Sequence, residues 1–98
     1  MSINKPLELT AITEIARHFR LQWEEVPQAW TLLYPEGRVQ LNSTAGEIIR
    51  RLDGKRTIAE ITEELQQAFN EPDLREDVLA ALDLAREHGW IKVKDNAA

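Results

Sequence analysis

Residues 19–42 read FRLQWEEVPQAWTLLYPEGRVQLN, with apolar and polar side chains alternating through much of the stretch. Phe19, Leu21 and Trp23 alternate with charged or amide residues, a pattern typical of a half-buried strand. Residues 30–34 are rich in aromatic and bulky side chains, which favours a second strand. The pattern therefore predicts two neighbouring strands at the start of this stretch.

A turn and a third strand follow directly. Pro35-Glu36-Gly37 is a turn signal, because proline presets φ and glycine tolerates a positive φ. Alternation then resumes over residues 38–42. Three short strands with tight connections predict an antiparallel meander.

Helix start signals come after the strands. Thr44 with Glu47, and Thr57 with Glu60, have the spacing of a capping box before apolar residues. We therefore expect two helices that begin near these threonines. Gly46 lies in the first turn of the earlier helix, where a close helix contact is the simplest reason for a glycine.

The third helix is predicted from the residues that begin and end it, and the other segments are short. A third helix is expected to open at Pro72 and to stop near Gly89. Residues 90–93 then favour a last short strand. Residues 1–18 suit either a short helix or an irregular arm, and residues 95–98 are expected to be a frayed tail.

Strands and helices thus form separate blocks along the chain, which indicates an α+β fold. A three-stranded antiparallel sheet followed by three helices is also the layout of a winged helix-turn-helix. With 98 residues the chain suits one domain, which we expect to span residues 19–94.

Composition limits the possible functions. The chain has no cysteine, so it lacks disulfides, thiol nucleophiles and thiolate metal sites. The N-terminus leads into no apolar signal segment, and no apolar stretch approaches the roughly 20 residues that span a bilayer. We expect a cytoplasmic protein without membrane contact.

Charge is distributed unevenly. The net charge is −5, yet residues 38–56 hold five bases against two carboxylates. Nucleic-acid affinity depends on neutralising many phosphates, so an acidic chain with one basic segment is not expected to bind nucleic acid. For any single one of these bases a solvated face is the favoured interpretation, and attraction of the segment to an acidic partner is the alternative.

No signature of catalysis is visible. His18 and His88 have no histidine or cysteine neighbour at ligand spacing, so we expect no metal site. The carboxylate pairs lie on polar helix faces or in a loop, whereas catalytic pairs need surroundings that separate their pKa values. We expect a binding protein without a cofactor, not an enzyme.

Several segments together resemble the PqqD family. These are RLQWE at 20–24, LYPEG at 33–37, LNSTAGEI at 41–48 and LDG at 52–54. The similarity covers about residues 19–93. It implies a winged-helix-like recognition element of the kind that serves ribosomal peptide maturation.

The resemblance also implies a function. Members of this family bind the ribosomal precursor peptide of pyrroloquinoline quinone (PQQ) and present it to a radical S-adenosylmethionine (SAM) enzyme. That enzyme cross-links a glutamate and a tyrosine within the peptide, so the expected partners are the peptide and this PQQ synthase. The family performs no chemistry itself and takes up the peptide as an added strand.

The resemblance places the peptide between the third strand and the third helix. The residues so implied are Arg38, Val39, Gln40, Leu41 and Asn42 on the strand, with Val78, Leu82, Ala85 and Arg86 on the helix. Val39 and Leu41 share one face of the strand, where a core role is the favoured interpretation. Arg38 is the better specificity candidate, since a guanidinium can clamp a carboxylate.

Two other functions stay open. A DNA-binding winged helix needs a basic third helix, but residues 73–87 carry five carboxylates against two arginines. A recognition domain for another modified peptide fits the same pattern. The chain is expected to be a monomer, or a dimer formed by exchanging terminal elements.

Overall fold

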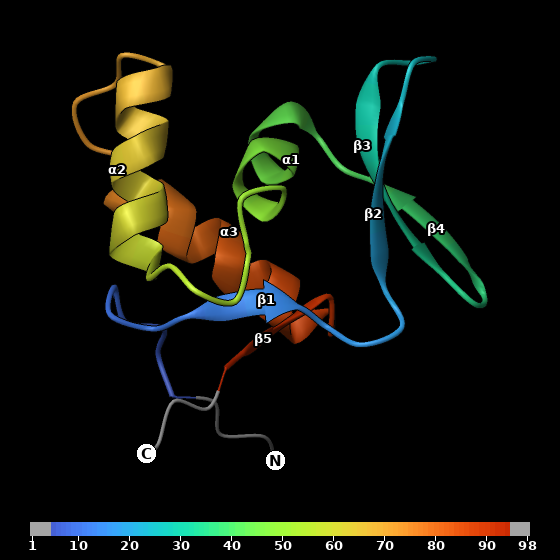
Figure 1. The fold of residues 1–98 in the computed structure, drawn as a ribbon, viewed down its shortest axis with the longest axis horizontal. Coiled ribbons are helices and arrows are strands. Elements are labelled where there is room, and N and C mark those ends of the chain that lie inside the picture. Colours follow the sequence, from blue (N-terminus) through green and yellow to red (C-terminus); the bar gives the residue numbers. More distant parts are fainter. Residues whose placement is uncertain (1–4, 95–98) are drawn as a thin grey trace.

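The computed structural model describes residues 5–94, and the expected frayed tail at 95–98 lies outside them. The elements run in the order β1 (Thr13–Ile15), β2 (Arg20–Glu24), β3 (Ala29–Tyr34), β4 (Gly37–Gln40), α1 (Ser43–Ile49), α2 (Ile58–Ala68), α3 (Arg75–Glu87) and β5 (Ile91–Val93). Figure 1 shows the three-stranded sheet to one side of the helices, with α1 between that sheet and α2. The predicted α+β fold is confirmed.

The main sheet is an antiparallel meander in the order β2-β3-β4, as the alternating pattern predicts. Leu32 of β3 lies opposite Leu21 on β2 and Val39 on β4, and it is fully buried. β4 is an edge strand of the sheet, so its backbone is paired with β3 on one side only.

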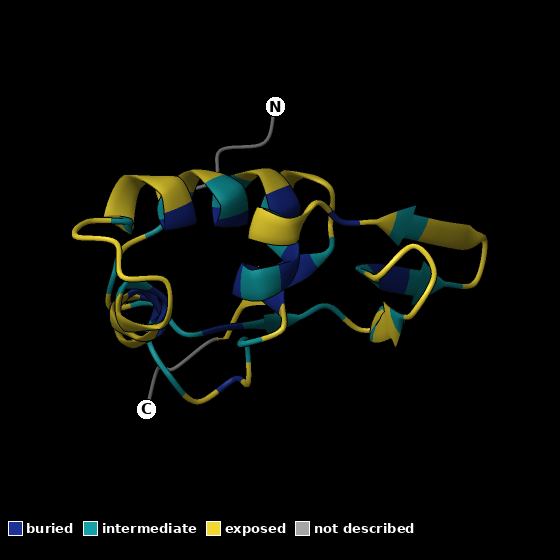
Figure 2. Ribbon diagram, turned by 90° about the horizontal axis from the view of Figure 1, so that it is seen from above, coloured by how far each residue is buried: buried dark blue, intermediate teal, exposed yellow. Residues whose placement is uncertain are grey.

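The core lies mainly where the helices meet each other and the sheet. Its buried residues are Leu32, Leu41, Ile48, Ile49, Ile58, Ile61, Leu65, Val78, Leu82, Ala85 and Ile91. Figure 2 shows buried segments on the inward sides of the helices and exposed segments on their outer sides. Within residues 5–94, no helix is both long and apolar enough to cross a membrane.

The helix starts are confirmed in one case and corrected in the other. Thr57 and Glu60 form the predicted capping box at the start of α2. The predicted box at Thr44 and Glu47 is wrong, because Asn42 caps α1 and its Oδ1 accepts a hydrogen bond from the amide of Ala45 at 2.8 Å. Asparagine is a strong N-cap, so the helix begins earlier than the threonine suggested.

The N-terminal segment contains a strand where the sequence left a short helix and an irregular arm as alternatives. β1 pairs antiparallel with β5, with Thr13 opposite Val93 and Ile15 opposite Ile91. Local preference does not predict this strand, because it forms by pairing with a strand distant in the sequence. The predicted last strand is confirmed as β5.

Candidate functional site

The open edge of β4 presents backbone hydrogen-bonding groups. The amide of Leu41 donates to the carbonyl of Trp30 at 2.9 Å, and Val39 lies two residues earlier in the same register. Along a strand of an antiparallel pair, the backbone N–H and C=O groups of one residue bond the partner strand, and those of the next residue point to the opposite side. Arg38 and Gln40 therefore each direct an N–H and a C=O toward the open side.

The side chains of β4 divide between its two faces. Val39 is half-buried, and Leu41, the residue directly after β4, is buried, so both face the core, as the favoured interpretation expected. Arg38 and Gln40 are exposed on the opposite face. The side chains of Arg38 and Gln40 would therefore lie next to the solvent-facing side chains of a strand added to this edge.

Arg38 already has an acidic partner. Its Nη1 donates to Glu24 Oε2 at 3.2 Å, and Thr31 Oγ1 donates to Glu24 Oε1 at 3.0 Å. The Arg38 side chain is 63% exposed and that of Glu24 only 17%. Because an ion pair this exposed is weak, a carboxylate from a bound peptide can compete for the guanidinium.

The helix residues named from the sequence lie mostly in the core. Val78, Leu82 and Ala85 are at most 1% exposed, so their side chains pack inside the protein. Arg86 is half-buried, and its Nη2 donates to Asp83 Oδ1 at 2.8 Å. These residues stay predictions as peptide contacts, and the side chains of the first three are almost fully covered by the protein's own core.

A groove lies between α1 and α3, next to the end of β4. It has a volume of about 130 Å³ and is lined by Asn42, Thr44, Ala45, Ile49, Ala81, Leu84, Ala85 and Trp90. We call it the edge groove. Asn42 and Ala85 were named from the sequence, whereas Leu84 was missed. Leu84 is 55% exposed, and its position beside the buried stripe of α3 is the signal that would have identified it.

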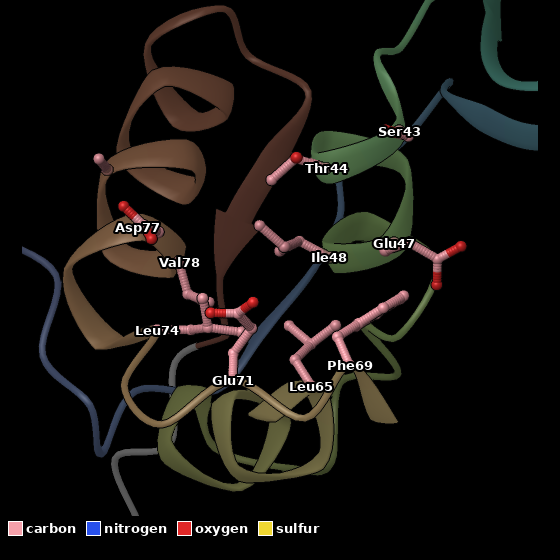
Figure 3. Close-up of a pocket in the computed structure, with 11 residues that line it drawn as sticks. Ser43, Thr44, Glu47, Ile48, Leu65, Phe69, Glu71, Leu74, Asp77 and Val78 are labelled. Carbon is pink, nitrogen blue, oxygen red and sulfur yellow. The ribbon is translucent and has the colours of Figure 1, made fainter. Parts of the chain in front are cut away.

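A second, larger hollow is enclosed by α1, α2 and α3, and we call it the helix pocket. Its volume is about 650 Å³. Ile48, Leu65 and Val78 point into it from the three helices (Figure 3). The remaining lining includes Ser43, Thr44, Glu47, Phe69, Glu71, Leu74 and Asp77. Thr44 lines the edge groove as well.

The bases of the middle segment are largely paired within the protein. Arg51 bonds Glu47 and Glu64, with N–O distances of 2.7 and 2.8 Å. Arg56 bonds Glu64 at 3.1 Å and Asp53 at 3.2 Å. Hydrogen bonds from these arginines lower the pKa of Glu47 and of Glu64. The guanidinium groups of Arg51 and Arg56 are therefore neutralised by carboxylates of the protein itself.

The two histidines lie at the end of a helix and in a turn. His88 caps the end of α3, and its ring stacks on Trp90 with the ring centres 4.7 Å apart. His18 adopts a positive φ in the turn before β2. Among residues 5–94, no group of three or more histidine, cysteine, aspartate or glutamate side chains is placed to hold a metal ion.

Comparison with known proteins gives consistent matches. The family described as "Coenzyme PQQ synthesis protein D (PqqD)" matches residues 29–91. A protein of Azotobacter vinelandii named "PqqA binding protein" is 45% identical, over 87% of this chain and 94% of its own. Proteins of the same name from Pseudomonas aeruginosa and Klebsiella pneumoniae are 41% and 36% identical, covering 88% and 91% of this chain and 95% and 98% of their own.

A solved structure has the same fold. It is the solution NMR structure of the PqqD truncation of Methylobacterium extorquens PqqCD, described as a functional and stand-alone RiPP recognition element. Its TM-score is 0.75, and the match covers 88% of this chain and 94% of that one. Sequence identity is 23%, so this likeness bears on the fold alone.

Proposed function

This chain belongs to the PqqD family, and we propose that it binds the ribosomal precursor peptide of pyrroloquinoline quinone and presents it to a radical SAM enzyme. We take PqqA to be this precursor peptide, so the name "PqqA binding protein" of the relatives supports the proposed peptide binding. In this role the chain does no chemistry, and the enzyme partner forms the cross-link between glutamate and tyrosine.

The open edge of β4 beside the edge groove carries the proposal. An extended peptide adds to the sheet by pairing with the outward backbone groups of Arg38 and Gln40. Its side chains on one face then lie against Ala81 and Leu84 across the edge groove. Edge-strand addition of this kind takes affinity from the backbone and specificity from the side-chain pockets.

The energies show why the groove is needed. About four backbone hydrogen bonds contribute roughly 0.5–1.5 kcal/mol each. Ordering four or five peptide residues costs on the order of 1–2 kcal/mol apiece. Backbone pairing therefore does not give net affinity by itself. Apolar contacts between peptide side chains and the edge groove must therefore supply the remaining favourable free energy.

Replacing Gln40 by proline tests this mode, with Gln40→Ala as the matched control. Proline removes the outward N–H but leaves the bonds between β3 and β4 in place, because those come from Val39 and Leu41. We expect calorimetric titration with the synthetic precursor peptide to show near-normal affinity for Gln40→Ala and about twofold to tenfold weaker binding for Gln40→Pro, since the one lost hydrogen bond contributes roughly 0.5–1.5 kcal/mol and about 1.4 kcal/mol is tenfold in affinity. Equal affinity for both variants, with unchanged melting temperatures, would rule out pairing at this edge.

A recognition domain for another modified peptide would use the same edge. Titration with an unrelated leader peptide separates the two functions. The proposal requires the quinone precursor peptide to bind more tightly than the unrelated peptide under the same conditions.

A further inference from the structure

The helix pocket is not occupied in the binding mode above, although it is several times larger than the edge groove. We propose that it takes a second segment of the same precursor peptide, one with an apolar side chain next to a lysine or arginine. This inference rests on the proposed function, because it concerns the same peptide.

The interior of the helix pocket is apolar. Ile48, Leu65 and Val78 are at most 3% exposed and form a closed floor. Phe69, at the end of α2, borders this floor and is 49% exposed (Figure 3). Such a concave apolar surface, within the usual size range of ligand sites, favours a large apolar side chain.

The rim of the helix pocket is acidic. Glu47, Glu71 and Asp77 lie among its lining residues. Glu47 is paired with Arg50 and Arg51, but among residues 5–94 no ion pair includes Glu71 or Asp77. Two carboxylates without a cation beside an apolar floor are complementary to a basic residue that flanks an apolar one.

The position of the helix pocket favours the same peptide over a separate partner. Thr44, in the first turn of α1, lines both this pocket and the edge groove. On α3, Asp77, Ala81 and Leu84 have the spacing that places residues along one side of a helix. A peptide that leaves the edge groove along this side of α3 therefore reaches the helix pocket.

Charge reversal at Asp77 tests the inference, with Glu76→Lys as the matched control. Both residues are exposed in the first turn of α3 and point about 100° apart around the helix. We expect Asp77→Lys to weaken binding of the synthetic precursor peptide about threefold to tenfold and Glu76→Lys to leave it within about twofold. Phe69→Ala should weaken it about fivefold through lost apolar contact.

A change in the peptide completes the test. Replacing its lysines and arginines by glutamine should weaken binding to the wild-type protein but have a smaller effect on Asp77→Lys, because the interaction is already lost. If Asp77→Lys and Phe69→Ala bind like the wild type while Gln40→Pro does not, the inference is wrong and the proposed function stands. If the wild-type protein does not bind the peptide, both are wrong. Melting temperatures confirm that each variant is folded.

Discussion

Gly46 of α1 packs its backbone directly against the indole of Trp30 on β3. A Cβ atom placed on Gly46 would lie 2.9 Å from Trp30 Cδ1, closer than such atoms approach in proteins. The close helix contact expected at this glycine is therefore present, and its partner is the strand β3. The close approach seats α1 on the sheet and so sets where the edge of β4 lies relative to α3.

Replacing Gly46 by alanine should destabilise the protein. Overpacking costs about 1–3 kcal/mol, and the better helix propensity of alanine returns up to about 1 kcal/mol. We expect a net loss of up to about 3 kcal/mol, seen as a lower melting temperature in a thermal denaturation experiment. Gly37→Ala is the control, because a Cβ there meets only the side chain of Tyr34, at 3.3 Å or more. Equal melting temperatures for the two variants would contradict the packing described here.

The local signals of the sequence predicted most of the fold. Alternation over residues 19–42 and the capping box at Thr57 act within a few residues, so they can be identified without the structure. The pairing of β1 with β5 could not be predicted, because it joins distant segments and depends on the helices between them.

The candidate site was only partly predictable for the same reason. Periodicity identifies the residues that a helix buries, such as Val78 and Leu82, and these were named as peptide contacts. The surface beside that stripe, at Ala81 and Leu84, becomes a groove only when α1 is packed against α3. The helix pocket likewise needs three helices in place.

Leu84→Ser should weaken binding of the precursor peptide by about fivefold or more, because it removes apolar surface from the edge groove. Stability should change by less than about 1 kcal/mol, since the side chain is 55% exposed. Val26→Ser is the control, an exposed apolar residue in the turn between β2 and β3. Calorimetric titration gives both affinities, and equal losses for the two variants would show that the groove is not used.

The pair between Arg38 and Glu24 predicts opposite effects of two substitutions. Arg38→Gln should weaken peptide binding up to about fivefold, because it removes a cation at the open edge. Glu24→Gln should strengthen binding or leave it unchanged, since it releases the Arg38 guanidinium. Affinities from the same titration decide the matter. If both variants bind weakly, the pair serves to shape the sheet instead of offering Arg38 to the peptide.

Acid should destabilise the protein through its arginine-bound carboxylates. Hydrogen bonds from Arg51, Arg56 and Arg75 lower the pKa of Glu47, Glu64 and Asp73, the last to about 2. A lowered pKa contributes stability above the ordinary values, 4.5 for glutamate and 3.8 for aspartate, and the contribution disappears as the pH falls through the folded-state value. The melting temperature should therefore fall from about pH 4.5 toward pH 2.

Glu64→Gln provides the comparison for that pH profile, because Glu64 accepts hydrogen bonds from both Arg51 and Arg56. The variant should be less stable at pH 7 and lose less stability on acidification. Glu63→Gln changes a neighbouring exposed carboxylate and should follow the wild-type profile. If the melting temperature of Glu64→Gln depends on pH as that of the wild type does, the hydrogen bonds of Glu64 with Arg51 and Arg56 do not contribute to acid sensitivity.

Hydrogen exchange of the β4 amides, with and without the synthetic precursor peptide, tests strand addition most directly. The outward amides of Arg38 and Gln40 should exchange rapidly in the free protein and become protected in the complex, while Val39, paired with β3, should be protected in both. Saturable peptide binding that leaves Arg38 and Gln40 unprotected, or that protects β2 at the other end of the sheet instead, would contradict the account.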